Sequence, residues 1–211
     1  MKKITQIITA ALSVLLLSST SIAQSQPIRG NFIINPYYGG PNFGKSLLQS
    51  TTVNGQPIED ADTKVSGLGP FGIRLGYMVT DNLSLGIDAI YNDFNITTNY
   101  TEVDDNNVTQ TYRVDLLSQR IRVHARMNYN FEMSTPEFNP YVGFGIGTNT
   151  RIMTVTDTGN GYEEDSESGS LIPFSARVAL GANYFLTDNI AINLEAGLGG
   201  PLVSGGVSFK F

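Results

Sequence analysis

The chain after Ala23 alternates between apolar and polar residues with a period of two, which is the pattern of β-strands that have two unlike faces. In the clearest stretch, Ile73, Leu75 and Tyr77 share one face, and Arg74 and Gly76 share the other. Seven such stretches run over residues 71–79, 83–92, 120–129, 142–147, 174–184, 190–198 and 203–211, and a less regular one covers 31–38. The pattern therefore predicts an all-β protein with eight strands.

The connections between these stretches fall into two classes that alternate along the chain. Thr80-Asp81-Asn82 and Thr187-Asp188-Asn189 predict tight turns whose last residue, an asparagine, adopts the left-handed conformation. Residues 132–139 form a longer turn and 199–201 a short one, whereas 40–68, 97–109 and 156–169 are predicted as long polar loops. Short connections at one end and long ones at the other are typical of an antiparallel up-and-down barrel in an outer membrane.

Alternation alone does not decide which face points into the barrel. A soluble lipid-binding barrel has apolar residues inside, and a membrane barrel has them outside. Charged residues make up only 15% of the chain, against roughly 25% in ordinary soluble domains. Aromatic residues at the ends of the apolar faces suit the two membrane interfaces; they are Tyr77, Tyr91, Tyr129, Phe174, Tyr184 and Phe209. Both observations favour the membrane barrel.

Charged side chains on the polar faces are then expected to line the lumen, because an arginine facing lipid at the bilayer centre costs about 2–4 kcal/mol. The predicted lumen charge network consists of Arg74, Asp88, Arg120, Arg122, His124, Arg126, Arg177, Glu195 and Lys210. Pairing Val79 with Leu83 places Arg74 opposite Asp88, a favourable cross-strand pair. Gly143, Gly145 and Gly147 are expected to leave room for the long side chains. Water, tyrosine or amide oxygens, or bound anions must balance the positive excess, and the sequence leaves open which.

The first residues form an export signal. Lys2 and Lys3 precede an apolar run over 7–17, and small residues at 21 and 23 suit a signal peptidase. We therefore predict a signal peptide over residues 1–23, cleaved after Ala23, and a barrel domain over 24–211. Removing the two lysines leaves 11 basic and 19 acidic residues, a net charge of −8, which argues against nucleic acid as a partner.

No residue pattern predicts a catalytic, cofactor or metal site. His124 is the single histidine, the nearest preceding serine is Ser118, and the histidine shares its face with the arginines, so a packed lumen histidine is expected. The glycine run over 143–147 is not followed by a helix, as a dinucleotide-binding motif requires. The acidic stretch that follows Asp157 lacks the ligand spacing of a calcium loop and is interpreted as a solvated loop.

Over residues 30–211 the sequence resembles the small eight-stranded outer-membrane barrels of Gram-negative bacteria, of the OmpA transmembrane-domain and OmpX type, including short porin-family proteins. The resemblance depends on the signal peptide, the alternating segments, the Thr-Asp-Asn turns and the terminal Phe211. It implies an eight-stranded antiparallel up-and-down transmembrane β-barrel. It also implies that Val207, Phe209 and Phe211 carry the signal that the barrel-assembly machinery reads.

The expected function is a structural or surface-interaction role in the outer membrane, because side chains just fill the interior of an eight-stranded barrel. The expected partners are outer-membrane lipids, the barrel-assembly machinery during biogenesis and an unidentified extracellular partner of the loops. One alternative is a narrow anion-preferring channel that uses the basic lumen. Two further alternatives are a lipid-modifying membrane enzyme and a soluble lipocalin-like binder.

Overall fold

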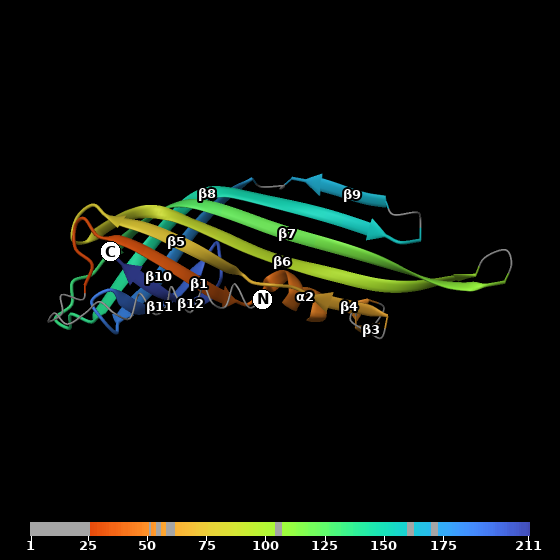
Figure 1. Ribbon diagram of the computed structural model, residues 1–211, viewed down its shortest axis with the longest axis horizontal. Helices are drawn as coiled ribbons and strands as arrows, with labels where there is room; N and C mark the ends of the chain where they lie inside the picture. Colours follow the sequence, from red (N-terminus) through yellow and green to blue (C-terminus); the bar gives the residue numbers. More distant parts are fainter. Residues whose placement is uncertain are drawn as a thin grey trace, which may run out of the picture.

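The computed structural model describes residues 26–50, 52–53, 56–57, 62–103, 107–159, 163–169 and 173–211; the predicted cleavage site at Ala23 lies outside these ranges. Eight strands close into one antiparallel barrel, which confirms the predicted fold class (Figure 1). They are β1 (Phe32–Gly40), β5 (Phe71–Met78), β6 (Leu83–Val103), β7 (Thr109–Asn130), β8 (Phe138–Asp157), β10 (Phe174–Phe185), β11 (Ile190–Leu198) and β12 (Val203–Lys210). Each strand pairs with its neighbour in the chain, and β12 returns to pair with β1.

Three barrel strands continue far beyond the ring as an extension (Figure 1). β6 and β7 pair without a break from Leu83–Tyr129 to Val103–Thr109, so most of the predicted loop over 97–109 is strand. The prediction was wrong there because a hairpin with water on both faces needs no apolar alternation, while its threonines and tyrosines still favour strands. The remaining short elements are α2 (Phe43–Ser50), β2 (Thr52–Val53), β3 (Gln56–Pro57), β4 (Thr63–Ser66) on β6, and β9 (Glu163–Ser168) on β8.

The described part of the chain includes no helix that is long and apolar enough to cross a membrane.

The predicted register of the first tight hairpin is confirmed. In the first hairpin Tyr77 pairs with Leu85, which places Arg74 opposite Asp88. In the second, Gly181 pairs with Glu195. Since a slip of one residue would exchange the two faces of a strand, these pairings fix which side chains enter the lumen.

The two Thr-Asp-Asn turns share one geometry, which differs from the predicted one. The Thr80 hydroxyl accepts the backbone N–H groups of Asn82 at 3.3 Å and Leu83 at 3.0 Å, and the Thr187 hydroxyl does the same at the second turn. Among the described non-glycine residues, positive φ is found at Asn107 alone, so neither turn asparagine is left-handed. The threonine hydroxyl stabilises the turn instead, by accepting hydrogen bonds from its backbone N–H groups. Each asparagine side chain then donates to the carbonyl at the end of a neighbouring strand, as Asn82 does to Asn130 at 3.1 Å.

The barrel wall is apolar outside and polar inside, which confirms the membrane-type orientation of the faces. Leu180 is 67% exposed and Ile87 is 50% exposed, whereas the next residue along the chain from Ile87, Asp88, is fully buried. Outward-facing aromatic residues lie near both ends of the wall, with Tyr77, Tyr129 and Tyr184 by the short turns and Phe71 and Phe174 by the extension. The five shorter barrel strands have 8 to 12 residues, close to the roughly 9–11 that cross a bilayer.

Candidate functional site

A cluster of polar side chains crosses the middle of the lumen, and every barrel strand contributes to it. In strand order the members are Tyr37, Arg74, Asp88, Arg126, Tyr141, Arg177, Glu195 and Ser204. All eight are buried, with at most 7% of the residue surface exposed. We refer to these eight residues as the central cluster.

Glu195 of β11 is the main acceptor of the central cluster. Its carboxylate accepts hydrogen bonds from Arg126, from Arg177 Nη2 at 2.7 Å and from the Tyr141 hydroxyl at 2.8 Å. Arg74 Nη2 lies 3.0 Å from the same carboxylate. Three guanidinium groups from three other strands therefore converge on one buried acid, and bonds of this charge-assisted type are stronger than neutral ones.

Asp88 of β6 provides the second negative charge. It accepts hydrogen bonds from the Tyr37 hydroxyl at 2.7 Å and from Arg126 Nη1 at 3.2 Å. The Arg74 guanidinium stacks over the Tyr37 ring at 3.7 Å from its centroid, which is a favourable cation–π position. Tyrosine hydroxyls thus bind to both carboxylates, and a tyrosine ring contacts one of the cations.

Three guanidinium groups against two carboxylates leave an excess of one positive charge in the central cluster. Amide and hydroxyl oxygens accept hydrogen bonds from the two Nη atoms of Arg74, which bonds Asn35 at 2.9 Å, Asn193 at 3.0 Å and Ser204 at 2.9 Å, whereas its Nε has no hydrogen-bond partner among the described residues. The sequence leaves open which groups surround the excess positive charge. At Arg74 they are neutral oxygens of the protein.

Glycines make space for the large side chains. A Cβ atom at Gly143 would overlap the Arg126 guanidinium, and one at Gly181 would overlap the Tyr141 ring. The prediction that the glycine run leaves room for long side chains holds at Gly143. It is wrong at Gly147, where the nearest atom is the backbone carbonyl of Val123 on the neighbouring strand.

Five residues of the predicted network meet in the central cluster, and four lie elsewhere. The five predicted residues that lie in the cluster are Arg74, Asp88, Arg126, Arg177 and Glu195. His124 is fully buried, and neither ring nitrogen has a hydrogen-bond partner among the described residues. Lys210 lies beside the short turns, with its Nζ 5.2 Å from the centroid of the Phe185 ring.

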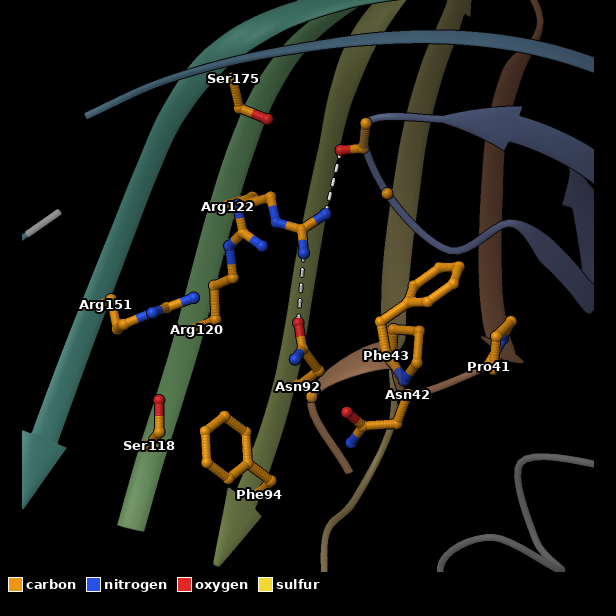
Figure 2. Close-up of a pocket in the computed structure, with 14 residues that line it drawn as sticks. Pro41, Asn42, Phe43, Asn92, Phe94, Ser118, Arg120, Arg122, Arg151 and Ser175 are labelled. Carbon is orange, nitrogen blue, oxygen red and sulfur yellow. Dashed lines mark hydrogen bonds between the residues drawn. The ribbon is translucent and has the colours of Figure 1, made fainter. Parts of the chain in front are cut away.

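Arg120 and Arg122 lie on the other side of the central cluster, at the end that carries the extension. Together with Arg151 they line a pocket of about 310 Å³, which we call the mouth pocket (Figure 2). Arg122 donates to the carbonyl of Gly199 at 3.0 Å, and Arg120 donates to Asn149 at 2.7 Å.

The three residues of the predicted assembly signal lie at the end of β12. Val207 and Phe211 are exposed on the outer face, and Phe209 is half-buried. The backbone of Phe211 exchanges two hydrogen bonds with Phe32, at 2.8 and 2.9 Å, which ties the end of the chain to β1. Their role in assembly stays a prediction.

Within the described ranges, no group of three or more His, Asp or Glu side chains is placed to hold a metal ion.

The sequence reasoning did not identify the two tyrosines of the central cluster. Tyr141 has the same parity as Gly143, Gly145 and Gly147, so alternation alone could have placed it inside. Tyr37 belongs to the least regular strand, but it lies opposite Gly72, whose missing side chain leaves space for its hydroxyl.

One family of known proteins matches most of the chain. Residues 9–200 match the family model described as outer membrane protein beta-barrel domain. Similar solved structures include two from Pseudomonas aeruginosa. One is the N-terminal β-barrel domain of OprF, with 16% identity, 88% of this chain and 100% of that chain covered, and a TM-score of 0.39. The other is OprG, with 14% identity, 90% of this chain and 99% of that chain covered, and a TM-score of 0.44. A third is outer membrane protein W of E. coli, with 14% identity, 87% of this chain and 99% of that chain covered, and a TM-score of 0.42. No curated protein sequence matches the chain. The match over most of its length shows that the chain belongs to the outer membrane protein beta-barrel domain family, and it is an integral β-barrel of the bacterial outer membrane.

Proposed function

We propose that this protein is a non-enzymatic envelope protein whose closed barrel anchors a surface-exposed extension. The observation that carries the proposal is the central cluster. Side chains from all eight strands join across the lumen and are buried there, and an eight-stranded barrel encloses little more space than its side chains fill. This arrangement favours a rigid anchor over a pore.

The extension supports the surface role. β6, β7 and β8 continue past the ring for many residues, and β4 and β9 widen the sheet on either side (Figure 1). Tyr100 and Tyr112 face each other there with ring centroids 5.5 Å apart, so the hairpin has its own packing contacts outside the barrel. A protruding sheet with free polar positions is suited to contact a partner by its edge or its face.

Planar-bilayer recording tests whether the lumen is closed. We expect no resolved conductance steps from the purified, folded protein. The double variant Tyr37→Ala and Tyr141→Ala removes two large rings from the central cluster and should give measurable conductance, while Tyr100→Ala on the extension should not. Resolved, anion-selective steps from the unaltered protein would contradict the closed lumen.

A narrow anion-preferring channel is the second candidate function, and one observation favours it. The mouth pocket carries three arginines at the entrance to the lumen, which would attract anions. Resolved anion-selective steps in the same recording would support this candidate.

Cysteine labelling on intact cells tests the surface position of the extension, since the chain has no cysteine of its own. Thr101→Cys places a thiol at an exposed position of the extension, and Glu132→Cys places one in the exposed turn at the opposite end. We expect a membrane-impermeant maleimide to label the first variant on intact cells, and the second only after the outer membrane is permeabilised. Labelling of the Glu132→Cys variant on intact cells, and of the Thr101→Cys variant only after permeabilisation, would contradict the proposed surface role.

A further inference from the structure

The mouth pocket brings together three arginines that have no acidic partner among the described residues. Arg120 and Arg151 are directly opposed on β7 and β8, an arrangement of like charges that is unfavourable by itself. Arg122 lies next to Arg120 on the same inward face. In the part of the chain that the structure describes, none of the three has a carboxylate oxygen within 4 Å.

The arginines have few protein acceptors. Arg122 is 8% exposed, and its buried Nε has no hydrogen-bond partner among the described residues. Arg120 uses its Nε for Asn149, and neither of its Nη atoms has a hydrogen bond to a described residue. A buried guanidinium donor without an acceptor is costly, so an additional acceptor at this position would be stabilising.

The other walls of the pocket complete a concave site. Ser118 and Ser175 provide hydroxyls, Asn92 provides an amide, and Phe94 provides an apolar face. The start of α2 lines the side opposite the arginines through Asn42 and Phe43 (Figure 2).

We propose that the mouth pocket binds a phosphate or sulfate monoester carried on a small hydroxylated body such as a monosaccharide. Guanidinium forks bind carboxylate and phosphate oxygens alike with paired hydrogen bonds, but three of them together can serve the three free oxygens of a monoester, whereas a carboxylate has two oxygens and chloride accepts no paired bonds. The volume of about 310 Å³ lies at the small end of the range for ligand pockets. The hydroxyl, amide and ring groups would then contact the body of the ligand.

Isothermal titration of the folded protein in detergent tests this proposal, with glucose 6-phosphate as the probe and glucose as the uncharged control. We expect glucose 6-phosphate to bind and glucose not to bind. Arg120→Gln and Arg151→Gln should each weaken binding about tenfold, since each removes a charge-assisted pair of hydrogen bonds. Arg113→Gln is the matched control, because Arg113 has the same charge on the same strand but lies outside the pocket. This variant should bind as tightly as the original protein.

Heat-dependent gel migration verifies that each variant is folded before it is titrated. No binding of glucose 6-phosphate, or an equal loss in all three variants, would overturn the proposal. Inorganic phosphate as a second probe should bind more weakly than glucose 6-phosphate; equal binding would contradict the contacts to the sugar body.

The same monoester chemistry occurs in free sugar phosphates and in the phosphorylated sugars of a membrane glycolipid. Titration in phosphatidylcholine vesicles, with and without a phosphorylated glycolipid, distinguishes the two sources. If the glycolipid occupies the pocket, it should weaken the apparent affinity for glucose 6-phosphate in the original protein. If the ligand is a free sugar phosphate, the affinity should be the same in both vesicles.

Discussion

The centre and the mouth of the barrel each hold three arginines on the inward face, but their surroundings differ. In the central cluster, Glu195 and Asp88 lie among the three guanidinium groups, together with two tyrosine hydroxyls. In the mouth pocket, the described residues offer the arginines only amide and carbonyl oxygens. The comparison shows that side-chain parity brings an arginine into the lumen, while residues on other strands decide whether its charge is neutralised inside the fold.

The two regions also differ in how many strands they join. Members of the central cluster come from all eight strands, and contacts such as Arg126 with Glu195 and Arg74 with Ser204 join strands that do not pair with each other and are distant in the chain. The mouth arginines come from β7 and β8, which already pair along their length. A change in the centre should therefore weaken the barrel as a whole, and a change nearer the extension should leave its stability almost intact.

Replacing Glu195 with alanine should have the largest effect on stability. Three buried guanidinium groups would keep Asp88 as their only carboxylate in the cluster, and breaking a buried ion pair from one side typically costs about 3–5 kcal/mol. The free energy of unfolding is measured by urea titration in phospholipid vesicles, with the folded fraction at each urea concentration determined from heat-dependent gel migration. Glu132→Ala in the exposed turn is the control and should leave it unchanged. Equal stability of the two variants would contradict the structural role of the central cluster.

An intermediate effect is expected when a methyl group is added beside the central cluster. The Cβ atom of Gly143→Ala would overlap the Arg126 guanidinium, which must then move away from Glu195. Overpacking of this kind costs about 1–3 kcal/mol. Gly76→Ala on β5 is a matched control, since no heavy atom lies within 4 Å of its added methyl group. The same urea titration should separate the two variants, and a Gly143→Ala protein as stable as Gly76→Ala would show that the centre is loosely packed.

Much of the barrel follows from the alternation of residues, and the contents of its lumen follow only in part. A period of two assigns each residue to a face, and the tight turns fix the register, so the pairing of Arg74 with Asp88 could be predicted. The contacts of Glu195 with Arg74 and Tyr141 cross the lumen, and they depend on how strands are staggered around the ring, which no local pattern encodes. The length of the extension was not predictable either, because its apolar residues do not keep to one face: Leu116, opposite Ile96, and Leu117 lie on opposite faces of the sheet.

The smallest effect is expected from an ion pair on the extension, where water reaches the charges. Arg113 donates to the Asp115 carboxylate through Nε at 2.6 Å and Nη2 at 2.8 Å, and these hydrogen bonds hold the pKa of Asp115 below its ordinary value. A carboxyl group whose pKa is lowered by folding stabilises the protein above the pKa of the unfolded chain, and this contribution disappears as the pH falls through the folded value. Arg113→Gln should therefore raise the pKa of Asp115 and slightly lower the stability at neutral pH, with no difference once Asp115 is protonated. Carbon-13 NMR titration of the carboxyl group checks the first effect and urea titration checks the second. An unchanged pKa of Asp115 would show that Arg113 does not determine its ionisation, in which case this ion pair contributes even less to stability than an exposed ion pair usually does.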